Sequence, residues 1–193
     1  SPIQLIARPQ VKRKRNRLRI PLVQLPWGIK RIGVYYTSVP RRYARPKVAI
    51  LDSGVSPHPN LQLSSLRANF SSETSPEDLN GHGTHIAGII GGFSLSHKKG
   101  KHAFRGVYPK LPLISVKAFG QDGQGTLSGI LRGIEWCMDH HIRVINMSFG
   151  MTKHHPLLHQ MIRLAHEEGI LMVAASGNEG KPGLSFPARY PEV

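Results

Sequence analysis

Short apolar runs alternate along the chain with longer segments whose apolar residues recur at helical spacing. The runs that predict strands lie at residues 47–52, 113–116, 144–147 and 170–175. Each is rich in aliphatic and β-branched residues and is too short for a typical helix. Pro57 and Pro59 follow the first run and prevent a helix from starting immediately after it. We therefore expect four strands, the first of them buried.

Three intervening segments predict helices. A glycine-rich turn leads into an apolar segment at 81–90, and Thr126 opens a segment whose apolar residues fall on one stripe through Met138. Pro156 suits the first position of a third helix, and Gly169 suits the position after its end. Each predicted helix lies between two predicted strands.

Alternating strands and helices predict an α/β fold. Strand–helix–strand units are nearly always right-handed crossovers, so we expect a mostly parallel β-sheet with helices on both faces. The carboxyl ends of parallel strands meet at one edge, which is where such sheets bind ligands. Asp52, residues 148–150 and residues 176–178 should therefore lie along one edge, where we look for chemistry.

Length and composition fit one compact domain with a hydrophobic core. The chain has 193 residues, of which 39% are hydrophobic, and its longest uninterrupted apolar run, 170–175, is far too short to span a membrane. A membrane partner is therefore not expected. The single cysteine, Cys137, excludes an internal disulfide framework. No signal-peptide core follows Ser1, and both an extracellular and a cytoplasmic location stay open.

Positive charge gathers at the start of the chain. The formal net charge is +15, 13 of the 26 lysines and arginines precede residue 48, and the first acidic residue is Asp52. Such an arm, residues 1–24, could neutralise phosphates, but it has no interleaved aromatic residues for base stacking. We therefore do not expect a nucleic-acid partner. A solvated extension and a pro-segment remnant both remain open for the arm.

Three segments carry a resemblance to a known family. They read VAILDSGV at 48–55, NGHGTHIAG at 80–88 and AASGNEG at 174–180. In this order they resemble the aspartate, histidine and oxyanion segments of the subtilisin-like serine proteases, the subtilases. The segments RGVYP at 105–109, GQGT at 123–126, VINMSFG at 144–150 and FPARYP at 186–191 resemble further family signatures. The resemblance runs from about residue 25 to 193, which implies a subtilisin-like peptidase domain over 25–193.

The resemblance implies a role for three side chains. A serine hydroxyl is a weak nucleophile, so an imidazole must accept its proton and a buried carboxylate must orient that imidazole. His82 and Asp52 match these positions, and Asn178 matches the side chain that donates to the oxyanion. His85 lies one helical turn later, and we expect a structural role for it. The alternatives are a strand-ending Asp52, a loop histidine at 82 and a turn-forming Asn178.

Further positions resemble the substrate cleft. The edge that pairs with extended peptide is matched by Gly123 and Gly125. The two walls of the main specificity pocket are matched by Ser148, Phe149 and Gly150 and by Ala175, Ser176 and Gly177. The implied partners are protein or extended peptide substrates. Within the arm, residues 17–22 resemble a short inhibitory segment of the family, which would make the arm a ligand of the chain's own cleft. Residues 25–30, which follow the arm, resemble the start of the catalytic domain.

No segment of the chain resembles the one that carries the family's nucleophilic serine. Ser128 belongs to a different family segment, at the edge of the cleft. We therefore expect the last strands and the central serine-bearing helix to be absent from these 193 residues, and the chain alone to be inactive. The expected function is that of a serine-type endopeptidase. A catalytically inactive peptide-binding or regulatory fragment is the alternative.

Metal binding receives little support from the sequence. Some family members hold calcium between an aspartate after the first catalytic strand and a loop after the histidine helix; here these positions are Asn60 and the lysine-rich 94–102. Calcium thus stays an alternative with a degraded ligand pattern. His154, His155 and His159 offer a zinc pair at helical spacing but have no nearby cysteine or acidic residue in sequence. We expect no cofactor and assign no metal ligand.

Overall fold

A computed structural model describes residues 26–34, 45–94, 104–178 and 185–193 of the chain. The basic arm, the segment 17–22 and most of the loop 94–102 lie outside these residues. Within the described residues, no helix is both long enough and apolar enough to cross a membrane.

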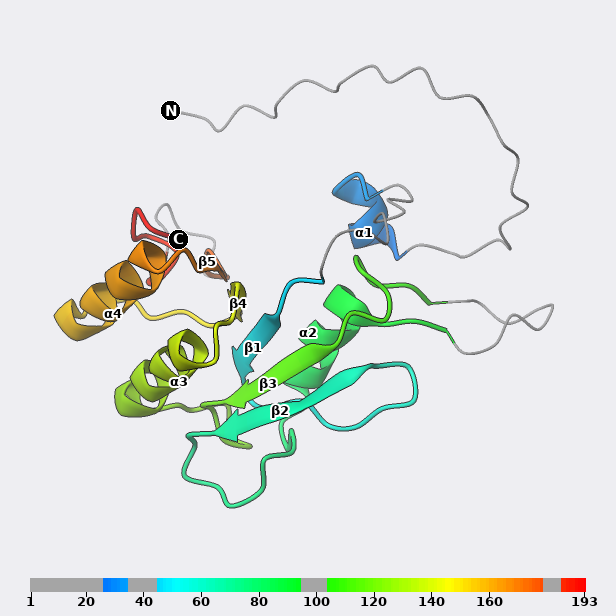
Figure 1. Cartoon of the computed structure of the whole chain (residues 1–193), viewed down its shortest axis with the longest axis horizontal. Coiled ribbons are helices and arrows are strands. Elements are labelled where there is room, and N and C mark those ends of the chain that lie inside the picture. The colour runs from blue at the N-terminus through cyan, green and yellow to red at the C-terminus, as the bar shows by residue number, and fades with distance from the viewer. Residues whose placement is uncertain (1–25, 35–44, 95–103, 179–184) are drawn as a thin grey trace.

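Five parallel strands form one sheet (Figure 1). Their order across the sheet is β2-β3-β1-β4-β5, with β1 at the centre. The strands are β1 (Val48–Asp52), β2 (Leu63–Asn69), β3 (Leu113–Lys117), β4 (Val144–Met147) and β5 (Leu171–Ala174). The chain first adds β3 on one side of β1 and later adds β4 on the other, so the change of direction falls beside the end of β1. Ligand sites of open α/β sheets form at such points.

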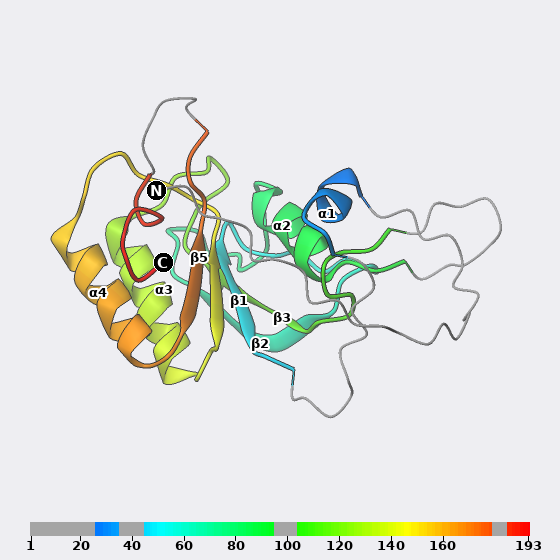
Figure 2. The same ribbon diagram turned by 90° about the horizontal axis from the view of Figure 1, so that it is seen from above.

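Helices cover both faces of the sheet. Helices α3 (Leu127–Asp139) and α4 (Pro156–Glu167) lie on one face, and α2 (His82–Gly91) lies on the other, with the short α1 (Trp27–Arg31) beyond it (Figure 2). The Thr126 hydroxyl caps α3 by accepting a hydrogen bond from Gly129 N at 3.0 Å. Pro156 begins α4, and Gly169 follows its end with φ +75°.

The α/β class and the parallel sheet with helices on both faces are confirmed. The four predicted strands and three predicted helices are present, with ends shifted by one or two residues. Strand β2 was not predicted, because its sequence LSSLRAN lacks a continuous apolar run and its exposure is mixed along its length. It forms through backbone pairing with β3, which sequence pattern does not report.

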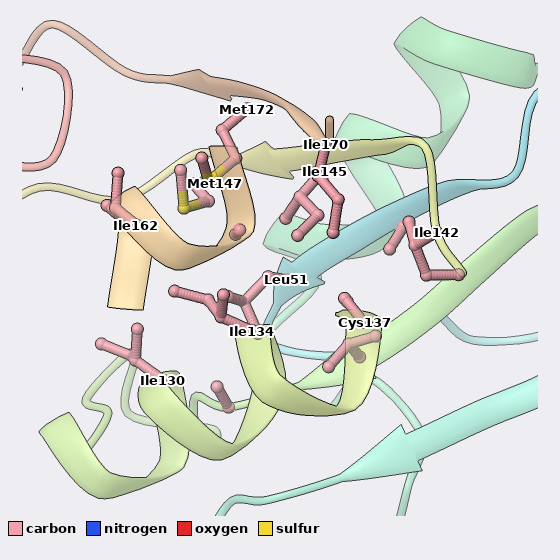
Figure 3. Close-up of a cluster of buried hydrophobic side chains, with 14 of the residues drawn as sticks. Leu51, Ile130, Ile134, Cys137, Ile142, Ile145, Met147, Ile162, Ile170 and Met172 are labelled. Atoms are coloured by element: carbon pink, nitrogen blue, oxygen red, sulfur yellow. The ribbon is translucent and has the colours of Figure 1, made fainter. Parts of the chain in front are cut away.

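The strand β1 is buried on both faces and separates two cores. Ala49 and Leu51 face the larger core under α3 and α4, whereas Val48 and Ile50 face the smaller core under α2. Figure 3 shows Leu51 among the side chains of the larger core, which α3, α4, β4 and β5 also supply. Helix α3 approaches closely because Gly133 has no side chain; a Cβ there would lie 2.6 Å from Leu51 Cδ1. This packing holds the end of β1 in place.

Candidate active site

Asp52 and His82 form a direct pair at the carboxyl end of the sheet. His82 Nδ1 lies 2.7 Å from Asp52 Oδ1, although 30 residues separate the two in sequence. Asp52 is the last residue of β1 and only 4% exposed, while the His82 side chain, at the start of α2, is 46% exposed. A buried carboxylate thus holds one nitrogen of a solvent-accessible imidazole. With Nδ1 donating to Asp52, the other ring nitrogen, Nε2, is left as a base.

Glycine at two positions lets the histidine turn approach the aspartate. A Cβ on Gly83 would overlap Gly54 O and come within 3.2 Å of Asp52 Cβ. Gly81, just before α2, has φ +95°, a conformation that residues with side chains rarely adopt. The sequence Gly81-His82-Gly83 therefore meets two separate needs, a left-handed turn and a close backbone contact.

Ser53 and Asp78 surround the pair with hydrogen bonds. Ser53 N donates to Asp52 Oδ1 at 2.7 Å, and the Ser53 hydroxyl accepts from Gly83 N at 3.0 Å. That hydroxyl lies 2.9 Å from Asp78 Oδ1 and 3.2 Å from Asp52 Oδ1, so its single proton goes to the nearer carboxylate of Asp78. Ser53 thereby links the aspartate strand to the loop before α2.

Asp78 was missed by sequence reasoning and organises the start of α2. Its carboxylate accepts from Gly81 N at 2.8 Å, from Thr84 N at 2.9 Å and from the Thr84 hydroxyl at 2.6 Å. Partial burial acts to raise the pKa of Asp78, but the hydrogen bonds from Thr84, Gly81 and Ser53 outweigh it and hold that pKa below its ordinary value. A signal was present: an acidic residue shortly before a helix start is a typical cap for unpaired amides.

A cavity of about 540 Å³ opens beside Asp52 and His82. It contains five of the eight substrate-binding positions expected from sequence, and its lining is Asp52, Ser53, Asn80, His82, Phe119, Gly123, Gln124, Gly125, Ile130, Ser148, Phe149, Gly150 and Met151. The lining combines the polar pair with an apolar wall, in which the rings of Phe119 and Phe149 lie 5.0 Å apart between centroids. Such a mixture is usual for a site that binds an organic ligand.

The segment 119–125 forms the edge of this cavity. Gly120 N donates to Gln124 O at 2.9 Å, Gly123 has φ +73°, and Phe119 and Gly125 form an isolated antiparallel bridge. A Cβ on Gly125 would lie 2.7 Å from the Phe119 ring, so only glycine fits there without displacement. The backbone of 123–125 consequently runs along the cavity rim with little side-chain cover.

The residues expected after β5 do not line this cavity. Ala175 N donates to Met147 O at 3.1 Å, and Ser176 O accepts from Ser185 N at 3.0 Å. Gly177 has φ +105°, and Asn178 is exposed with no side-chain hydrogen bond among the described residues. These four residues share the carboxyl edge of the sheet with Asp52 and Ser148, but the structure does not bring Asn178 to the Asp52–His82 pair.

No serine among the described residues is bonded to His82 Nε2. The Ser148 hydroxyl lies 2.8 Å from Asn146 Nδ2, which donates to it, and the Ser128 hydroxyl lies 3.2 Å from the Thr126 hydroxyl. His85 is exposed on the next turn of α2 and makes no side-chain hydrogen bond within the described part of the chain. His82 is therefore the histidine that Asp52 orients.

The candidate metal positions are used for other contacts. Asn60 Nδ2 donates to Phe93 O at 2.7 Å. His159 Nε2 lies 3.1 Å from Glu192 Oε2, a neighbour that the sequence had not indicated, and His154 Nδ1 lies 3.2 Å from the Tyr190 hydroxyl. Among the described residues, no three histidine, cysteine, aspartate or glutamate side chains gather as a metal site would require.

Comparisons with known proteins agree with the resemblance found in the sequence. Residues 44–193 match the model of the subtilase family. The chain is similar to minor extracellular protease Epr of Bacillus subtilis (strain 168), 41% identical over 149 residues that cover 76% of this chain and 22% of the relative. It is similar to a thermostable alkaline protease of Halalkalibacterium halodurans, 36% identical over 187 residues, 96% of this chain and 50% of the relative.

A third relative is subtilisin BL of Lederbergia lenta. It is 39% identical over 172 residues, which cover 86% of this chain and 60% of the relative. The chain thus spans between 22% and 60% of the length of these three relatives.

Proposed function

The chain belongs to the subtilase family. From this premise we propose that it is part of a serine endopeptidase in which Asp52 and His82 are two members of the catalytic triad. The observation that carries the proposal is the 2.7 Å contact between His82 Nδ1 and Asp52 Oδ1 beside a cavity large enough for part of a peptide. A buried carboxylate, an imidazole and an adjacent cleft are the parts that nucleophilic acyl transfer requires.

The proposed reaction moves one proton through His82. Nε2 accepts the proton of a serine hydroxyl as the serine oxygen attacks the peptide carbonyl carbon, and the carbonyl oxygen becomes an oxyanion. Asp52 stabilises the imidazolium and keeps its Nδ1 proton in place. The imidazolium then gives its proton to the departing amine, which leaves an acyl-enzyme. The same nitrogen takes a proton from water as the water oxygen attacks the ester carbon, and it returns that proton to the serine oxygen as the ester bond breaks and the carboxylic acid product leaves.

Two further roles belong to the proposal. Asn178 donates its side-chain amide to the oxyanion, which requires that its segment approach the reacting carbonyl when substrate is bound. The backbone of 123–125 pairs with an extended peptide, while the apolar wall around Phe119, Ile130 and Phe149 holds a substrate side chain. Two of the relatives named above are proteases by name and the third is a subtilisin, which supports protein or peptide substrates.

The nucleophile in this proposal is a serine outside residues 1–193. Ser53 and Ser148 line the cavity, but their hydroxyls are bonded to Asp78 and Asn146. Because neither of these hydroxyls is bonded to His82, a second candidate function is also favoured. In it, the chain is a catalytically inactive peptide-binding or regulatory fragment that uses this cleft without cleaving its ligand. Both functions use the Asp52–His82 cavity, and they differ in covalent chemistry alone.

Labelling with a fluorophosphonate probe separates the two functions. The probe is applied to the full natural gene product and to residues 1–193, with peptide hydrolysis measured in parallel. We expect labelling and hydrolysis in the gene product and neither in residues 1–193. His82→Ala should lower kcat by about 10⁶-fold, a magnitude known from subtilisin itself.

His85→Ala is the matched control, because it removes an exposed imidazole one turn further along α2. It should leave kcat within about twofold. A gene product that binds peptide but neither reacts with the probe nor hydrolyses peptide would support the binding function instead. Equal losses of kcat in the two variants would show that the histidine is wrongly assigned.

The basic arm has a separate place in the proposal. Because residues 17–22 resemble an inhibitory segment, we propose that the arm occupies the cleft and competes with substrate. Deleting residues 1–24 should then lower the apparent KM of the gene product. An unchanged KM would assign the arm to another role.

A further inference from the structure

Lys117 is a lysine with no exposed side-chain surface beside the candidate active site. It ends β3 and its ammonium group lies 2.9 Å from each of three oxygens: Ser53 O, Glu77 O and Glu73 Oε2. A lysine ammonium has three N–H donors; here it donates hydrogen bonds to the two carbonyl oxygens and forms an ion pair with Glu73 Oε2. Lysines are almost never fully buried unless they are paired, so this arrangement calls for an explanation.

Glu73 supplies the opposite charge. A hydrogen bond from Gln121 N and the adjacent ammonium of Lys117 outweigh burial and lower the pKa of the Glu73 carboxyl, so the carboxylate is ionised at neutral pH. Three further carboxylates lie near this pair. Asp52 is opposite Lys117 in the β1–β3 register, Glu77 pairs with Arg67 at 2.8 Å, and Asp122 flanks Gly120 together with Glu73. Lys117 and Glu73 thus form an ion pair between a fully buried ammonium group and a carboxylate that is 24% exposed.

The pair touches three segments that surround Asp52 and His82. Ser53 O belongs to the turn directly after Asp52, and Glu77 O directly precedes Asp78, which organises the start of α2. Glu73 Oε1 accepts from Gln121 N at 2.6 Å, and Gln121 O accepts from Asn80 Nδ2 at 2.8 Å. One buried charge thus connects the aspartate turn, the loop before the histidine and the rim at 119–125.

We propose that Lys117 is a positioning residue of the site: its ammonium holds the turn after Asp52 against the loop 73–78 so that His82 bonds to Asp52, and Glu73 extends this constraint to the cavity rim through Gln121. The contribution to catalysis rests on the proposed protease function. The contribution to the Asp52–His82 geometry does not, because it concerns a hydrogen bond present without substrate.

The first test reads the Asp52–His82 hydrogen bond directly. The proton on His82 Nδ1 should give a low-field resonance in the proton NMR spectrum of the chain, assigned by its loss in His82→Ala. In Lys117→Met, two buried carbonyls and the Glu73 carboxylate lose their partner, and we expect this resonance to disappear. In Glu73→Gln, which keeps an acceptor for Gln121 N, we expect it to move upfield but persist.

Lys47→Met is the matched control. Lys47 Nζ donates to His140 O at 3.0 Å at an exposed position, so this variant also removes a lysine–carbonyl bond, but away from the site. Its low-field resonance should match that of the parent chain. Circular dichroism on every variant shows whether it is folded. If Lys117→Met does not fold, the low-field resonance of Glu73→Gln tests the positioning role instead.

The second test uses the active gene product. Displacement of the catalytic pair should lower kcat of Lys117→Met by about 100-fold. Release of the rim in Glu73→Gln should mainly raise KM. If the gene product has no activity but the low-field resonance responds as expected, the positioning role stands and the protease function fails.

Two outcomes would overturn the positioning role. One is a parent chain without the low-field resonance, since then the bond that Lys117 is proposed to hold is not formed in solution. The other is a folded Lys117→Met or Glu73→Gln variant whose resonance and kcat equal those of the parent, which would make the ion pair a support of general stability only.

Discussion

Gly83 and Gly54 meet so closely that no side chain fits between their backbones, and this contact sets the distance from His82 to Asp52. A Cβ on Gly83 would overlap Gly54 O, which belongs to the turn following Asp52. The geometry of the Asp52–His82 pair therefore depends on a backbone contact beside the two side chains as much as on the side chains themselves.

Gly83→Ala should destabilise the fold and weaken the Asp52–His82 bond. Either the start of α2 or the turn at Gly54 must move, and overpacking of this kind costs about 1–3 kcal/mol. Thermal unfolding measures the loss. The control is Gly88→Ala in the same helix, where a Cβ meets nothing within 4 Å, and this change should stabilise the chain by about 0.5–1 kcal/mol. Similar effects of the two changes would contradict the close-contact explanation.

Asp78→Asn should remove a pH-dependent part of the stability. Because the pKa of folded Asp78 lies below its ordinary value of 3.8, its hydrogen bonds stabilise the fold at higher pH and stop doing so as the pH falls through the lowered pKa. The variant should lose about 1–3 kcal/mol near pH 7, and the difference from the parent chain should shrink below about pH 4.

Unfolding temperatures of both chains between pH 3 and pH 7 provide the measurement. Asp139→Asn, at an exposed carboxylate with no partner among the described residues, should show no such pH dependence. A constant difference between Asp78→Asn and the parent at all pH values would argue against the ionised network.

The sheet face that α2 covers should bind a hydrophobic dye where it extends over β5. Helix α2 covers β1 and β3, but Leu171 and Val173 on β5 remain 62% and 49% exposed. Replacing both by threonine, which suits strands, should reduce dye fluorescence and light scattering of residues 1–193. Leu157→Thr removes a separate exposed leucine on α4 and serves as control. Unchanged dye binding in the double variant would place the apolar surface elsewhere.

Cys137 should be unreactive in the folded chain. Its side chain is fully buried in the larger core, and burial raises the pKa of its thiol to about 12. A thiolate is the reactive form, so a disulfide reagent at pH 8 should label Cys137 only after denaturant is added. Rapid labelling of one thiol without denaturant would mean that α3 detaches from the sheet under native conditions.

Local pattern was sufficient for most of the elements. The runs that became β1 and β3 are apolar because both of their faces are buried, whereas in β4 and β5 every second residue is the more buried one. The stripe beginning at Leu127 marks the buried side of α3. Strand β2 was not predicted because a half-exposed strand at the sheet edge needs only backbone pairing, which many sequences allow.

The amino-acid sequence by itself determined the alternation of strands and helices, the family and the placement of Asp52 at a strand end and His82 at a helix start. Only the tertiary structure decided that these two side chains meet at 2.7 Å, that Asp78 accepts hydrogen bonds from the start of α2, and that Lys117 is buried against Ser53 and Glu73. It also left Asn178 outside the lining of the cavity beside the pair. The reason is physical: hydrophobic periodicity reports which side of a segment is buried. The partner of a polar atom depends on strand register and loop path, which form when distant segments pack together.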